Sequence, residues 1–247
     1  MLSRSRYAMG RALISVAAAT ALAAVVGTAA SAVVRYGNDI SWPQCGGAFP
    51  ARAGFGIVGV GNGVPFSTNP CLAAEWQWAV AARGAPAYYM NLSNPGAASS
   101  HWNQGGPKPC SGSSTDLGCA YDYGWNAAAA AFAYASSQTS PASAVAHVWW
   151  IDVETTNTWS PNTAVNLAVV QGALVYLKQQ TSKAVGVYST SYQWGVITGG
   201  AHVGAPVWAA GASSAASAPS SCGTGFTGRP VRLVQFPDGS YDGDYRC

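Results

Sequence analysis

Short apolar runs of strand length alternate with longer segments of helix length along most of the chain. We expect strands at 36–41, 55–60, 87–92, 147–153, 184–189, 206–210 and 231–236. We expect helices between them at 71–83, 121–137, 162–180 and, shorter, 192–197. Alternation of this kind, with strands that are apolar on both faces, is typical of a parallel sheet covered by helices.

The helical segments become scarce after about residue 200, and we expect one more short strand between Ala201 and Ser221. This pattern predicts an α/β fold, a β/α (TIM-like) barrel with irregular, helix-poor final strands. An open doubly wound sheet is the alternative, and it would carry a glycine-rich phosphate loop after its first strand. The Gly59–Gly63 segment (GVGNG) follows the second strand instead, and no helix begins directly after it.

The first 32 residues have the composition of an export signal. Arg4, Arg6 and Arg11 precede an apolar run over 12–26, and a small-residue site, Ala30-Ser31-Ala32, follows it. An uncleaved membrane anchor is the alternative, because residues 12–34 carry no charge. The alanine-rich run and its small-residue site favour a cleaved signal peptide over 1–32, one domain over 33–247, and a secreted, bacterial, extracellular protein.

The three signal arginines account for the whole formal charge of +3. Beyond residue 32, nine basic residues face nine acidic ones, so no basic patch is left for a nucleic-acid partner. We also expect no membrane partner after signal removal, and a monomeric protein.

Six cysteines lie beyond the signal, and an even number in an exported chain favours disulfides. Zinc is the rival explanation, but no CxxC motif and no histidine at ligand spacing accompanies them. We therefore expect no metal or other cofactor. Nearest-neighbour pairs would each staple a loop-rich stretch, and we expect Cys45–Cys71, Cys110–Cys119 and Cys222–Cys247.

Two carboxylates end the most apolar strand. Asp152 and Glu154 close the segment WWIDVE, and residues two apart on a strand share a face, about 6–7 Å apart. At the end of a barrel strand they would face the barrel mouth, where active sites of this fold are built. Repulsion between them should raise one pKa, which leaves a proton donor beside an anion, as glycoside hydrolysis requires. The alternative is a pair that caps a helix or binds a basic side chain.

The sequence places some of the other acidic residues in the site and others outside it. Asp39 ends the first strand and would reach the same mouth, although Asn-Asp pairs are also common in turns. Glu75 lies in a helix, where we expect a solvated surface residue. Asp238 follows the last expected strand, and we expect it in a solvated tail; for Asp242 and Asp244, both a tail and a site remain open.

Five blocks, in the same order along the chain, resemble the motifs of the family 25 glycoside hydrolases, the lysozyme-type muramidases. They are DISWPQ at 39–44, WIDVE at 150–154, VYST at 187–190, VWAA at 207–210 and LVQF at 233–236. The resemblance implies a β/α barrel that cleaves the β-1,4 link after N-acetylmuramic acid in peptidoglycan. It implies Glu154 as general acid and Asp152 as its assistant, either as nucleophile or by orienting the substrate acetamido group. The remaining implied site residues are Asp39, the closing acid Asp244 (with Asp242 the second choice), Tyr188, Trp208 and Gln235.

All ten tryptophans lie beyond the signal, and sugar rings stack on aromatic faces. By strand parity, Trp150 shares the face of Asp152 and Glu154. We expect Trp42 and Trp102, in loops, at the rim of the cleft.

The chain also departs from the family pattern. Its second strand, ending at Gly59–Gly63, lacks the usual basic residue and acid, and its third has Tyr88-Tyr89-Met90-Asn91 in place of Tyr-His. A long insertion over 93–118 is also unusual. The alternative to an enzyme is therefore a non-catalytic barrel that binds cell-wall glycan, and a secreted structural protein is the third possibility.

Overall fold

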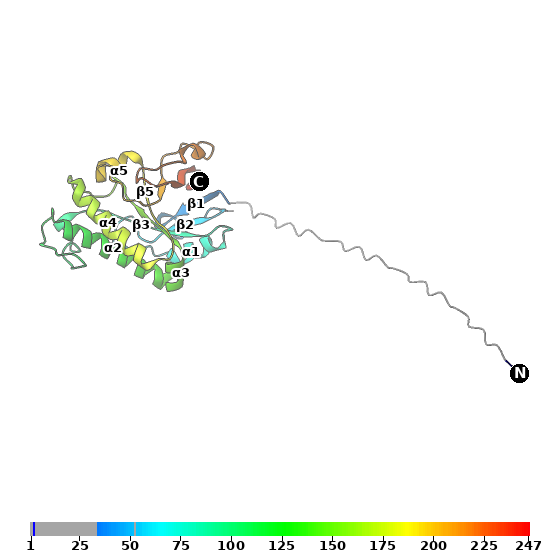
Figure 1. The fold of residues 1–247 in the computed structure, drawn as a ribbon, viewed down its shortest axis with the longest axis horizontal. Helices are drawn as coiled ribbons and strands as arrows, with labels where there is room; N and C mark the ends of the chain where they lie inside the picture. Colours follow the sequence, from blue (N-terminus) through cyan, green and yellow to red (C-terminus); the bar gives the residue numbers. More distant parts are fainter. Residues whose placement is uncertain (1, 3–33, 52) are drawn as a thin grey trace. The chain divides into compact units, whose positions relative to one another are not determined.

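Eight strands close into a barrel in chain order in the computed structural model, which describes residue 2, residues 34–51 and residues 53–247 (Figure 1). The strands are β1 Tyr36–Ile40, β2 Gly56–Gly59, β3 Ala87–Asn91, β4 Val148–Asp152, β5 Val185–Ser189, β6 Val207–Ala209, β7 Val231–Asp238 and β8 Tyr241–Arg246. Neighbours from β1 to β7 are parallel. The prediction of a β/α barrel is confirmed, whereas the expected signal peptide lies, apart from Leu2, outside the described residues.

Helices follow the early strands and are short or absent after β5, as the sequence pattern predicts. They are α1 Leu72–Ala81, α2 Leu117–Gln138, α3 Pro141–Ala146, α4 Thr163–Gln180 and α5 Ser191–Thr198, with 3₁₀ turns η1 Trp42–Gln44, η2 Gly96–Ala98 and η3 Ala218–Ser221. Side-chain caps begin the longest two: Asp116 accepts from Gly118 N in α2, and Asn162 accepts from Ala164 N in α4. No helix in the described part of the chain has both the length and the apolar character needed to cross a membrane.

The expected position of the eighth strand is wrong. The segment between Ala201 and Ser221 contains β6 and the turn η3, whereas the closing strand β8 lies at 241–246 and pairs antiparallel with both β7 and β1. Its sequence, YDGDYR, has none of the apolar character of the other strands. Backbone pairing with two neighbours holds it, so Asp242 and Asp244 belong to the barrel wall rather than to a tail.

The helices α2 and α4 lie side by side outside the barrel (Figure 1). Gly124 of α2 would place a Cβ 1.9 Å from Val169 O, and Gly172 of α4 would place one 2.0 Å from Tyr121 O. The two backbones therefore approach more closely than any larger residue would allow.

Side chains alternate between the barrel interior and this helical layer. Trp149 points outward, where its Nε1 donates to Ala144 O of α3. Trp150 points inward and packs edge-on against Trp208, with ring centroids 5.9 Å apart. This arrangement confirms the parity prediction that Trp150 shares the face of Asp152.

Three disulfides are present among the described residues, and each joins the predicted nearest neighbours. Cys45–Cys71 connects the segment after β1 to the start of α1. Cys110–Cys119 ties the insertion after β3 to the first turn of α2, and Cys222–Cys247 ties the segment after η3 to the end of β8.

Candidate active site

A polar cavity of about 130 Å³ opens at the C-terminal ends of the parallel strands. Its wall is formed by Asp39, Tyr89, Asp152, Glu154, Tyr188, Trp208, Gln235 and Asp242. Of the site residues predicted from the sequence, all except Asp244 and the two rim tryptophans, Trp42 and Trp102, line this cavity. None of the described wall residues is basic, so no side chain described there would form an ion pair with an anionic ligand.

Asp152 is the most deeply placed acid of the pair on β4, with 5% of its surface exposed. Asn91 Nδ2 donates to its Oδ2 from the adjacent end of β3, while its buried Oδ1 has no partner among the described residues. Burial first, and the neighbouring charge of Glu154 second, raise the pKa of Asp152 well above its ordinary value. Protonation would turn the unpaired oxygen into a donor toward Glu154.

Glu154 lies two residues further on and is only half-buried at the cavity wall. Burial and the charge of Asp242 raise its pKa above the ordinary value, while hydrogen bonding with Gln193 and Asp152 acts in the opposite direction. Its backbone is held as well, because Trp159 Nε1 donates to Glu154 O at 2.7 Å. The raised pKa values of both acids favour retention of a proton by the pair, beside the opening of the cavity.

Asp39 anchors the other side of the cavity through a chain of hydrogen bonds. Gln235 Nε2 donates to Asp39 Oδ2 at 3.0 Å, and Tyr188 OH donates to Gln235 Oε1 at 2.7 Å. Burial raises the pKa of Asp39 to about 7, against the opposing effect of the Gln235 bond. Three strands, β1, β5 and β7, thus fix one carboxyl group.

The two acids of β8 have different surroundings. Asp242 lines the cavity beside Asp39, its register partner on β1. Asp244 is fully buried below it and accepts from Trp208 Nε1 at 2.7 Å. Burial, and then the charge of Asp39, raise the pKa of Asp244 well above its ordinary value, and its buried Oδ2 has no hydrogen-bond partner among the described residues. Asp242, the second choice from the sequence, is thus the β8 acid that faces the cavity.

The two rim tryptophans predicted from the sequence differ from each other. Trp42 in η1 is 46% exposed but does not line the cavity. The rim prediction for Trp102 is wrong, because this side chain is 2% exposed and its Nε1 donates to Ser113 O. Trp102 holds the insertion over 93–118 together from inside, which the polar composition of that segment concealed.

Sequence reasoning missed three residues of the site, namely Tyr89, Asn91 and Gln193. Tyr89 and Asn91 alternate inward at the end of β3, and Asn91 is the direct register partner of Asp152. Strand parity, combined with alignment of β3 beside β4, could have found both. Gln193 comes from α5, a helix whose approach to Glu154 no local pattern indicates.

The prediction that Glu75 is a solvated surface residue is wrong. Its side chain is 0% exposed, and Asn69 Nδ2 donates to its Oε2 at 2.6 Å while also donating to Gly59 O. Burial raises the pKa of Glu75 to about 7. It packs behind the cavity rather than lining it. In the described part of the chain, no group of three or more His, Cys, Asp or Glu residues is arranged to hold a metal ion.

Comparison with known proteins supports the resemblance inferred from the motifs. The sequence profile of the family described as Lysozyme-like protein 1 matches residues 123–221, which include β4 to β6. A search of curated proteins found no match.

Solved structures with a similar fold include several lysozymes. A muramidase from Trichobolus zukalii is 17% identical, with 86% of this chain and 93% of that chain covered and a TM-score of 0.53. A family 25 lysozyme from Aspergillus fumigatus is 16% identical over 86% and 93%, with a TM-score of 0.54. A bacterial lysozyme from Streptomyces coelicolor is 16% identical over 86% and 91%, with a TM-score of 0.52. The chain therefore has the barrel fold of these lysozymes, which confirms the resemblance at the level of the fold.

Proposed function

We propose that this protein is a secreted glycoside hydrolase that cleaves β-1,4 bonds of peptidoglycan, acting as a monomer outside the cell after removal of residues 1–32. One observation carries the proposal: the Asp152 and Glu154 carboxyl groups lie together in the wall of a cavity of acids and aromatic rings at the mouth of the barrel. The raised pKa of each acid favours retention of a proton by the pair. Acid-assisted cleavage of a glycosidic bond needs this combination of proton donor and second carboxyl group.

Glu154 is the general acid, because it borders the opening while Asp152 is buried behind it. When substrate enters, a proton held by Asp152 moves to Glu154 and then to the glycosidic oxygen as the C1–O bond breaks. The Asp152 carboxylate, held by Asn91, then faces the developing positive charge or orients the acetamido group. Water adds to C1, and its proton restores the pair.

Other wall residues hold the sugar. Asp39 and Asp242 accept hydrogen bonds from ring hydroxyls, and Tyr188 and Trp208 present aromatic surface to the ring. Trp42, exposed beyond the cavity, contacts a more distant sugar of the chain. Asp244 acts through Asp39 and Trp208 rather than on substrate.

The test is release of reducing ends from purified peptidoglycan by wild-type protein and by Glu154→Gln. We expect at least a hundredfold loss in the variant, because removal of a general acid typically costs 10²–10⁴ in rate. Glu75→Gln is the matched control, since it makes the same chemical change outside the cavity. We expect Glu75→Gln to retain activity under conditions in which circular dichroism shows that it is folded.

Two outcomes would decide against the proposal. If wild type releases no reducing ends between pH 4 and 8 yet sediments with insoluble peptidoglycan, the protein is a glycan-binding barrel. If Glu154→Gln and Glu75→Gln are equally active, the acid pair is not the catalytic site.

A further inference from the structure

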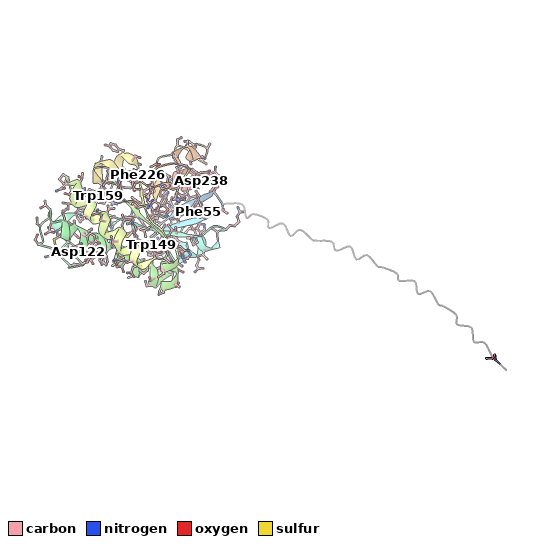
Figure 2. All side chains as sticks on the ribbon, in the orientation of Figure 1. Phe55, Asp122, Trp149, Trp159, Phe226 and Asp238 are labelled. Carbon is pink, nitrogen blue, oxygen red and sulfur yellow. A yellow bond between two sulfur atoms is a disulfide. The ribbon has the colours of Figure 1, made fainter. Side chains whose placement is uncertain are left out.

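The barrel has a second cavity at the end opposite the carboxylates, here named the lower cavity. It measures about 560 Å³, which lies in the range typical of small-molecule sites. Ala87, Val148 and Ala184 at or beside the N-terminal ends of parallel strands form part of its wall. Phe55 (labelled in Figure 2) and Leu233 add buried apolar surface to this wall.

The charged side chains on the described wall of the lower cavity are two arginines, Arg232 and Arg246. The Arg246 guanidinium is half-buried and lies 4.2 Å from the ring centroid of Phe55. Burial lowers the pKa of Arg246, because its charge is partly removed from water. No Asp or Glu side chain is among the described wall residues. Asp244, which does not line the cavity, favours the charged form of Arg246, and an anion in the cavity would complement the guanidinium further.

The residues around the lower cavity add further positive charge. Arg35, Arg83 and Lys183 come shortly before β1, β3 and β5, so the chain direction brings them to the lower end of the barrel. The acids Asp39, Asp152 and Glu154 lie at the upper end. In a chain with only 9% charged residues, this separation gives the lower end a field that attracts anions.

We propose that the lower cavity binds a small anionic amphiphile, with one apolar chain between Phe55 and Leu233 and an anionic head at Arg246 and Arg232. Apolar walls bury the chain, and the guanidinium groups supply hydrogen-bond donors in the geometry that a carboxylate accepts. Binding in the lower cavity is independent of glycoside cleavage at the other end of the barrel.

The test uses dodecanoate, below its micelle concentration, titrated into the protein by calorimetry. We expect saturable one-to-one binding by wild type and about tenfold weaker binding by Arg246→Gln, as loss of one charge-assisted contact predicts. Lys178→Gln is the matched control, because Lys178 is exposed on α4 and does not line the cavity. We expect it to bind as wild type does, and equal weakening by both variants would overturn the proposed head-group site.

Substitutions that fill the lower cavity test where the apolar chain of the ligand binds. Leu233→Trp should abolish binding, and Ala184→Phe, at an exposed wall position that folding tolerates, should weaken it strongly. Neutral dodecanol should bind more weakly than dodecanoate, and butyrate should not bind. Absence of dodecanoate binding at 1 mM would overturn the proposal. Adsorption to anionic vesicles that Leu233→Trp leaves unchanged, without binding of free dodecanoate, would overturn it in favour of a basic surface.

Discussion

At the scale of single residues, Asp152 and Glu154 are chemically similar but differently placed. Asp152 is buried against Asn91, whereas Glu154 borders the cavity and receives a hydrogen bond from Gln193. The surroundings, rather than the residue type, therefore divide the roles of the pair. Gln193 is itself held by Thr155 N, which donates to Gln193 Oε1 at 2.6 Å.

Gln193→Leu should raise the pKa of Glu154, because the Gln193 hydrogen bond favours the ionised carboxylate. The pH profile of kcat/KM checks this: the alkaline limb, where the acid loses its proton, should move to higher pH. Tyr192→Phe, at an exposed neighbouring position, should leave that limb in place. If Gln193→Leu lowers kcat but leaves the alkaline limb of the pH profile in place, Gln193 does not act through the pKa of Glu154.

Glu75 makes stability depend on pH. Its pKa is raised from 4.5 to about 7 by burial, so the unfolded state ionises first. Below pH 4.5 Glu75 is protonated in both the folded and the unfolded state, and the free energy of unfolding is then at its highest with respect to this group. As pH rises to 7, ionisation in the unfolded state lowers the free energy of unfolding by an amount of the order of 3 kcal/mol. Glu75→Gln should remove that part of the slope in urea unfolding measured from pH 4 to 8. Parallel curves for variant and wild type would contradict the buried placement of Glu75.

At the scale of elements, the close contact of α2 with α4 depends on two glycines. Gly124→Ala should lower the free energy of unfolding by about 2 kcal/mol or more, because the added methyl overlaps Val169 O. Gly195→Ala is the contrasting control, since its Cβ would meet no atom within 4 Å inside α5. Helix propensity predicts a gain of about 0.5–1 kcal/mol there. Thermal unfolding should show a lower stability for Gly124→Ala and a higher stability for Gly195→Ala. Equal effects of the two substitutions would contradict the close contact between α2 and α4.

How far each element could be predicted depends on where its stability originates. The apolar run of β4 and its two acids carry their own signal, so that strand and the pair were predictable from local pattern. The polar strand β8 is stabilised by pairing with β1 and β7, which no local pattern records. Glu75 and Trp102 were misplaced for the same reason, because burial of a polar helix position or of a loop tryptophan depends on distant neighbours.

At the scale of the whole molecule, barrel closure depends on the C-terminal hairpin that carries Asp242 and Asp244. The Cys222–Cys247 disulfide ties its end across 25 residues of sequence. Replacing both cysteines by serine should lower the free energy of unfolding by about 3 kcal/mol. The same change at Cys110–Cys119, which closes a shorter loop away from β8, should cost less. Urea unfolding measures both, and a larger loss for the shorter loop would contradict this view of closure.

The central claim is that the acid pair at the barrel mouth cleaves peptidoglycan after N-acetylmuramic acid. Borohydride reduction of the released fragments, followed by mass spectrometry, identifies the sugar at each new reducing end. We predict reduced N-acetylmuramic acid ends from wild type and none from Glu154→Gln. Reduced N-acetylglucosamine ends, or fragments released equally by the variant, would contradict the account.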